Sequence, residues 1–137
     1  MAKTLGPAKV VFACVANAGR SQMASAFFNK FANPKRAFAV SAGTRPAQAV
    51  HAEVVAAMRE IGVDLSQAKP EYLSSDVCKG AHILITMGCG DQCPLVPGVE
   101  RDEWTIDDPQ GKPPQTVRLI RDQIKKFVTD LIRERRW

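Results

Sequence analysis

The sequence predicts a single α/β domain, built on a four-stranded parallel sheet with helices on both faces. Apolar runs of strand length alternate along the chain with stretches whose apolar residues recur at helical spacing. This alternation implies right-handed crossovers and a parallel sheet that is covered on both sides. The length also suits one domain with a substantial core, so residues 1–137 are expected to form a single unit.

The first half of the chain predicts two strands and two helices. Pro34 stops the first helix, Pro46 introduces the second, and Gly62 is a natural residue to follow it. Gly43 follows the second strand, where a glycine indicates a turn or a close approach of two backbones. In order, the expected elements are a strand over 9–15, a helix over 21–31, a strand over 36–41 and a helix over 47–61.

The second half predicts two further strands and two further helices. Pro70 suits the first position of a helix, and the run before Gly88 is nearly all apolar, as in a strand that is buried on both faces. In order, the expected elements are a helix over 71–79, a strand over 81–87, a strand over 103–106 and a helix over 116–133.

Composition excludes several classes of protein. No stretch approaches the roughly 18 consecutive apolar residues that span a membrane, and no apolar segment follows the N-terminal lysines as in a signal peptide. We therefore expect a cytoplasmic protein with no membrane partner. In a reducing compartment, the four cysteines are expected to be thiols, catalytic groups or metal ligands rather than a disulfide framework.

The net charge of +5 raises the question of nucleic-acid binding. The basic residues are concentrated in the last expected helix, where acidic residues lie among them, and no nucleic-acid motif or aromatic platform accompanies them. We expect a solvated helical face and no nucleic-acid partner, with a mild attraction for oxyanions. These residues are Arg118, Arg121, Lys125, Lys126, Arg133, Arg135 and Arg136.

The loop between the first strand and the first helix carries the clearest chemical pattern. Small residues in such a loop bring backbone N–H groups together in front of a helix N-terminus, where they bind anions. The same field stabilises a thiolate, so Cys14 is expected to be a nucleophile. Arg20 can offer a planar fork to two oxygens, and Ser21 can donate a hydrogen bond to the sulfur. Asn17 tolerates a left-handed backbone.

Two later loops are expected to meet this one, because the carboxyl ends of parallel strands share one edge of the sheet. The loop over 88–101 contains Cys89 and Cys93, and a further loop contains Asp108 before a proline. Both loops follow expected strands. The sequence therefore predicts a site formed by Cys14, the two loop cysteines and Asp108.

These motifs resemble the low-molecular-weight protein tyrosine phosphatase family, and in particular its arsenate-reducing branch. The signature is a cysteine, five residues, an arginine and a serine directly after the first strand, and the similarity spans nearly the whole chain. The matching segments are Cys14 to Ala24, Ser41 to Thr44, Gly62 to Ser66, Ile85 to Pro94 and Trp104 to Pro109.

The resemblance implies reduction of arsenate to arsenite without a metal or organic cofactor. Cys14 would attack arsenic, Asp108 would protonate the departing oxygen, and Cys89 and then Cys93 would take over the oxidised sulfur by thiol exchange. Phosphate or sulfate would bind as analogues. The oxyanion would lie on the loop formed by Val15, Ala16, Asn17, Ala18, Gly19, Arg20 and Ser21.

Three departures from relatives qualify this resemblance. Gly19 stands where many relatives have a second cysteine, and Gln110-Gly111 replaces the aromatic residue that helps the phosphatases to grip phosphotyrosine. The short spacing of Cys89 and Cys93 resembles an actinobacterial type, some of whose members use mycothiol. The external reductant is therefore expected to be thioredoxin or a low-molecular-weight thiol such as mycothiol.

Several alternatives stay open at this point. The chain could hydrolyse phosphotyrosine or aryl phosphates, or bind oxyanions as a non-enzymatic sensor. Asp107 competes with Asp108 as the acid, or the Asp-Pro pair forms a simple turn. Cys89 and Cys93 could form a static disulfide, or could bind zinc together with Cys78 and His82.

Overall fold

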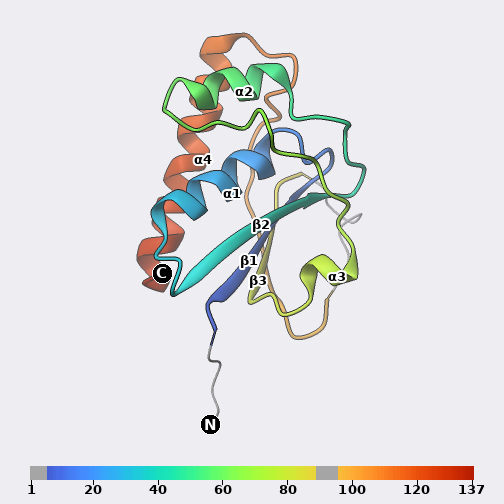
Figure 1. The fold of residues 1–137 in the computed structure, drawn as a ribbon, viewed down its shortest axis with the longest axis vertical. Helices are drawn as coiled ribbons and strands as arrows, with labels where there is room; N and C mark the ends of the chain where they lie inside the picture. The colour runs from blue at the N-terminus through green and yellow to red at the C-terminus, as the bar shows by residue number, and fades with distance from the viewer. Residues whose placement is uncertain (1–5, 89–95) are drawn as a thin grey trace.

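The computed structural model describes residues 6–88 and 96–137. Its elements are β1 (Ala8–Cys14), α1 (Arg20–Phe31), β2 (Ala37–Gly43), α2 (Ala52–Arg59), α3 (Ser75–Cys78), β3 (Ile83–Thr86), β4 (Glu100–Glu103) and α4 (Pro114–Arg135) (Figure 1). The four strands form one parallel sheet in the order β2-β1-β3-β4. The predicted α/β class with a four-stranded parallel sheet is confirmed.

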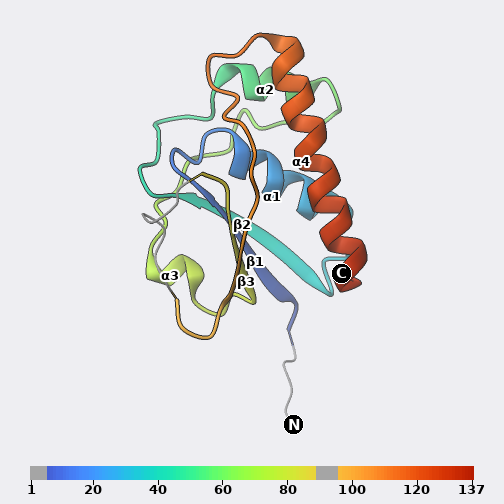
Figure 2. The same cartoon turned by 180° about the vertical axis from the view of Figure 1, so that it is seen from behind.

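Side chains of β1 alternate between two hydrophobic clusters, one on each face of the sheet. Phe12 and Cys14 belong to the larger cluster, which includes buried residues of α1, α2 and α4. Ala13 belongs to the smaller cluster with Cys78 of α3. Figure 2 shows α4 running beside α1, with α3 away from both. Helices therefore cover both faces of the sheet, but the long helices lie on one face.

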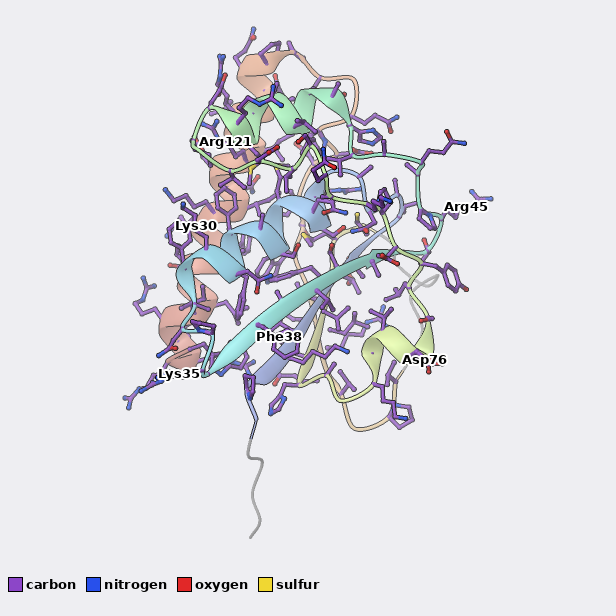
Figure 3. The ribbon with its side chains drawn as sticks, viewed as in Figure 1. Lys30, Lys35, Phe38, Arg45, Asp76 and Arg121 are labelled. Carbon is purple, nitrogen blue, oxygen red and sulfur yellow. The ribbon has the colours of Figure 1, made fainter. Side chains whose placement is uncertain are left out.

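Two basic residues of the closing helix, Arg118 and Arg121, bond to the C-terminal end of α2, although the sequence placed them on a solvated face. Arg121 is the exception to that prediction, because it is buried and its Nη1 atom donates to the Ala57 carbonyl at 2.8 Å. The same atom lies 2.9 Å from Glu60, whose carboxylate also accepts three hydrogen bonds from Arg118. Figure 3 shows Arg121 where α2 and α4 meet. Charged hydrogen bonds thus connect α4 to the end of α2, a contact that the sequence pattern did not predict.

The helix expected over 47–61 is shorter, because α2 begins at Ala52 and ends at Arg59. The N–H groups of Ala47 and His51 donate to carbonyls of the loop after β1, so His51 does not bond to the Ala47 carbonyl as a helix over 47–61 would require. Gly62 follows the helix with a φ of +81°, which suits the predicted glycine. The prediction was wrong at the helix start because it could not include bonds to a distant loop.

The helix expected over 71–79 is wrong in its first half. Only Ser75–Cys78 is helical, and the Ser74 hydroxyl accepts a hydrogen bond from the Val77 N–H at 3.2 Å, which caps this late start. Tyr72 instead forms an isolated parallel bridge with Gly43. The segment before α3 therefore extends the sheet edge rather than adding a turn of helix.

The fourth strand also lies earlier than expected, at Glu100–Glu103 rather than over 103–106. All four of its residues are exposed, as is typical of a charged edge strand. Trp104 and Ile106, which lie in the expected strand, are buried just beyond the observed one. Within the described residues, no helix has the length and apolar content needed to cross a membrane.

We expect Glu60→Gln to destabilise the protein most at neutral pH. Hydrogen bonds from Arg118 and then Arg121 lower the pKa of Glu60 from 4.5 to about 2. Because the folded-state pKa is the lower one, this stabilisation is complete above pH 4.5 and is lost as the pH falls towards about 2. Urea unfolding at several pH values should show the midpoints of wild type and variant converging over that range.

The control for this experiment is Glu103→Gln, which changes an exposed glutamate on β4. Its midpoint should follow that of the wild type at each pH. A difference between Glu60→Gln and wild type that is the same in neutral and acidic solution would contradict the assignment.

Candidate active site

Cys14 ends β1 with its thiol directed towards the first turn of α1. Its Sγ atom lies 2.9 Å from the Ser21 hydroxyl oxygen, and only 3% of the residue is exposed. The predicted contact between Ser21 and the sulfur is therefore present. The sulfur therefore lies at the N-terminal end of α1, which is the positive end of the helix dipole.

Asn17 holds the Ser21 hydroxyl in place beside the Cys14 sulfur. The Asn17 side-chain oxygen accepts from the Glu71 N–H at 2.8 Å, so its amide group donates to the Ser21 hydroxyl oxygen at 2.7 Å. The Ser21 oxygen keeps a second lone pair, so its hydroxyl can accept from the Cys14 thiol or donate to the sulfur. A thiolate at Cys14 would accept that hydrogen bond. Asn17 has a φ of 50°, so its predicted left-handed backbone is also confirmed.

Backbone carbonyls of the loop are bonded to the segment that follows β2, which runs beside the loop in Figure 1. Among the described residues, none accepts a hydrogen bond from the N–H groups of residues 15–21. These N–H groups, together with the helix dipole, provide the donors for an oxyanion. The carbonyl acceptors and their donors are Cys14 and Thr44 (3.2 Å), Val15 and Arg45 (2.8 Å), Ala16 and Ala47 (2.9 Å), and Ala18 and His51 (2.9 Å).

Gly43 is required by the close approach of two backbones, as its position after the second strand predicted. A Cβ atom at this residue would lie 2.5 Å from the Val15 carbonyl oxygen and 2.8 Å from the Asn17 nitrogen. Any side chain here would displace the loop. Arg45, two residues after Gly43, is exposed at the outer edge of the molecule (Figure 3).

Gln22 is a supporting residue to which sequence reasoning gave no role. It is 5% exposed, and its amide nitrogen donates to the Asn17 backbone oxygen at 3.1 Å and to the Asn17 side-chain oxygen at 3.2 Å. The same nitrogen lies 3.3 Å from the Lys69 carbonyl. The sequence offered one signal for this role, which is that Gln22, a polar residue, stands next to Met23 on a helix face that packs in the core. Gln22 thus joins the loop to the segment before α3.

Arg20 and Asp108 are brought together, as predicted. One guanidinium nitrogen donates to the Ile106 carbonyl at 2.9 Å, and another lies 3.8 Å from a carboxylate oxygen of Asp108. The Arg20 side chain is 12% exposed and that of Asp108 is 53% exposed, so the pair lies at the mouth of the site. The other Asp108 oxygen accepts from the Gln110 N–H at 3.0 Å, which forms the turn expected around an Asp-Pro pair.

Gly88 leaves room for the guanidinium group of Arg20. Its φ is +94°, and a Cβ atom there would lie 2.6 Å from the Nη1 atom of Arg20. The absence of a side chain thus allows Arg20 to reach both Ile106 and Asp108.

Cys89 and Cys93 lie outside the described residues, so their predicted roles are not tested by the geometry. Cys78 is buried, and burial raises the pKa of its thiol, as for a structural cysteine. His82 is exposed just before β3. Over residues 6–88 and 96–137, no group of three or more His, Cys, Asp or Glu side chains forms a metal site.

Residues 9–136 match the family model described as low molecular weight phosphotyrosine protein phosphatase. The chain belongs to this family. It is 40% identical over 130 residues to a putative arsenate reductase of Halobacterium salinarum, with 92% of each chain covered. Both this match and the family model extend over nearly the whole sequence.

Solved structures of this family have the same fold. A thioredoxin-dependent arsenate reductase of Corynebacterium glutamicum has a TM-score of 0.80 and 36% identity, covering 94% of this chain. The match spans 62% of that longer chain. An arsenate reductase in the phosphate binding state has a TM-score of 0.80 and 28% identity, with 93% of this chain and 98% of that chain covered.

We expect Gly88→Ala to weaken oxyanion binding by displacing Arg20. Loss of one charge-assisted hydrogen bond should raise the dissociation constant for phosphate about tenfold. Isothermal titration with phosphate would measure this change. Gly98→Ala is the matched control, because Gly98 also has a positive φ, of +81°, but no atom lies within 4 Å of an added Cβ.

Both substitutions introduce similar backbone strain, and Gly88→Ala should lower the thermal midpoint further because it also displaces Arg20 from the Ile106 carbonyl. Only the substitution beside Arg20 should change phosphate affinity. Equal affinities in the two variants would show that Arg20 does not depend on Gly88.

Proposed function

We propose that this protein reduces arsenate to arsenite, with Cys14 as the nucleophile. The observation that carries the proposal is the 2.9 Å contact between the Cys14 sulfur and the Ser21 hydroxyl at the N-terminus of α1. A buried cysteine held there suits attack on an anion bound by the same helix end. The names of the relatives agree with this activity.

In this proposal, arsenate binds to the N–H groups of residues 15–21 and to the Arg20 guanidinium. Phosphate and sulfate are tetrahedral analogues that would bind in the same way. Support comes from the carbonyl groups of the loop, which are engaged by the segment after β2. The phosphate binding state of a related arsenate reductase is a further argument for an oxyanion site.

The first step forms a bond between the Cys14 sulfur and arsenic and breaks one arsenic–oxygen bond. Asp108, in its protonated form, gives its proton to the departing oxygen, which leaves as water. Ser21 donates its hydrogen bond to the thiolate before attack. Arsenic remains in its oxidised state in the covalent intermediate.

In the second step the Cys89 thiolate attacks the Cys14 sulfur. The electron pair of the sulfur–arsenic bond leaves with arsenic, so arsenite departs and the two cysteines form a disulfide. Cys93 then attacks Cys89, which frees Cys14 and moves the disulfide to the later pair. Cys89 directly follows Gly88, the residue that lies against Arg20, and this sequence position supports its role as the first attacker.

An external thiol must return two electrons to the Cys89–Cys93 disulfide. Thioredoxin is one candidate, supported by the thioredoxin-dependent enzyme of Corynebacterium glutamicum. A low-molecular-weight thiol such as mycothiol is the other, because the spacing of the two cysteines resembles a type with mycothiol-using members. A reductant screen with arsenate, with oxidised thiols identified by mass spectrometry, would distinguish them and test the reaction itself.

Phosphatase activity is the second candidate function, and the family model favours it. Cys14, Arg20 and Asp108 would suffice for hydrolysis of an aryl phosphate, with water completing the reaction. Gln110 and Gly111 follow the Asp-Pro pair in place of an aromatic residue, which makes phosphotyrosine a weaker substrate for this chain. Arsenate reduction therefore remains the main proposal.

We expect Cys89→Ala to abolish arsenate reduction while sparing hydrolysis of 4-nitrophenyl phosphate. Cys14→Ser should lower both rates by about a thousandfold or more, because it removes the nucleophile. Steady-state assays with arsenate plus reductant and with the aryl phosphate would measure the two activities. Cys78→Ala is the control for removal of a thiol and should retain both.

Equal loss of the two activities in Cys89→Ala would argue against a redox role for this cysteine. If the Cys14→Ser variant reduced arsenate at the wild-type rate, the assignment of Cys14 as the nucleophile would be refuted. A wild-type chain that binds arsenate but never turns it over with any thiol would instead favour an oxyanion sensor.

A further inference from the structure

The first turn of α2 contacts the loop that carries Asp108. Glu53, in this turn, accepts a hydrogen bond from the Gly111 N–H at 2.6 Å through one carboxylate oxygen. The two residues are 58 positions apart in the sequence. This N–H group lowers the pKa of the Glu53 carboxyl, so the acceptor is charged and the hydrogen bond is of the stronger kind.

The same turn is also fixed to the loop after β1. The His51 N–H donates to the Ala18 carbonyl at 2.9 Å, and a Cβ atom at Gly19 would lie 3.7 Å from Val54. That Cβ would lie 3.0 Å from the Pro109 ring, so Gly19 allows Pro109 to pack closely on the loop. The first turn of α2 thus connects the oxyanion-binding loop to the loop of Asp108.

Asp108 lies between two attachment points of its own loop. Arg20 holds the loop at the Ile106 carbonyl, two residues before Asp108, at 2.9 Å. Glu53 holds it at Gly111, three residues after Asp108. The Asp108 side chain is itself 53% exposed, so packing alone fixes it weakly. Its place beside Arg20 depends on the backbone to which it is attached.

We propose that Glu53 is a positioning residue, which keeps Asp108 beside the oxyanion by anchoring the backbone at Gly111. Glu53 contacts neither the Cys14 sulfur nor Arg20 in the described structure, so its effect on the reaction passes through Asp108. This inference rests on the proposed function, in which Asp108 protonates the departing oxygen. Without the anchor, the loop would adopt other conformations and the proton donor would be misplaced.

The test compares Glu53→Ala with Glu53→Gln, which keeps an acceptor oxygen at the same distance along the side chain. Hydrogen exchange over residues 107–112 should be faster in Glu53→Ala and near the wild-type rate in Glu53→Gln. The single-turnover rate of thiol oxidation at saturating arsenate should fall about tenfold in Glu53→Ala, a part of the full contribution of a general acid. The dissociation constant for phosphate should stay within about twofold.

The decisive measurement is made with Glu53→Ala in a protein that already carries Asp108→Asn. If Glu53 acts through Asp108, Glu53→Ala should cause no further loss of rate once Asp108 is replaced. Glu60→Ala is the matched control, because this glutamate at the end of the same helix bonds to Arg118 and Arg121 of α4 instead. It should lower stability without changing exchange over residues 107–112 or the single-turnover rate.

Three outcomes would each overturn the proposal. Hydrogen exchange over residues 107–112 could be unchanged in Glu53→Ala, or the losses of rate from Glu53→Ala and Asp108→Asn could be fully additive in the double variant. The third outcome is that phosphate binding weakens by the same factor as the single-turnover rate. Failure of the proposed function would look different. The wild-type chain would then not oxidise its thiols with arsenate, whereas exchange over residues 107–112 would still report on the hydrogen bond to Gly111. Glu53 would in that case be a structural residue.

Discussion

The loop after β1 keeps its shape because the segment after β2 satisfies its carbonyl groups. Four carbonyls of residues 14–18 accept backbone hydrogen bonds from residues 44–51. With these acceptors engaged on one side, the N–H groups of the loop remain for an anion. The arrangement has structural costs elsewhere, since Gly43 must lack a side chain and residues 47–51 cannot join α2.

Buried polar side chains hold the sulfur within this loop. Asn17 and Ser21 are fully buried, and Gln22 nearly so, yet each has hydrogen-bond partners in the described structure. A buried amide without partners would destabilise the fold by about 1–3 kcal/mol, so the set is stable only when all its members are in place. The orientation of the Asn17 amide, which donates to Ser21, follows from the Glu71 N–H, on a segment distant in sequence.

Local sequence predicted the elements whose hydrogen bonds are local or whose side chains are buried. The strand at Ala8–Cys14, the loop after it and the helix at Arg20–Phe31 were all expected within a residue or two. The start of α2 and the segment before α3 were missed, because their N–H groups bond to the loop 15–18 and to Asn17. β4 was misplaced because a charged edge strand has no apolar pattern.

The candidate active site shows the same division between features that the sequence predicts and features that depend on distant contacts. Cys14, Arg20 and Asp108 were expected together because the carboxyl ends of parallel strands share one edge of the sheet, a rule of topology that needs no coordinates. Gln22, Gly88 and Glu53 each lie against a group far away in the sequence, and no periodicity or motif encodes such a contact. Topology thus brings the reacting groups to one edge, whereas their precise placement depends on individual non-local hydrogen bonds.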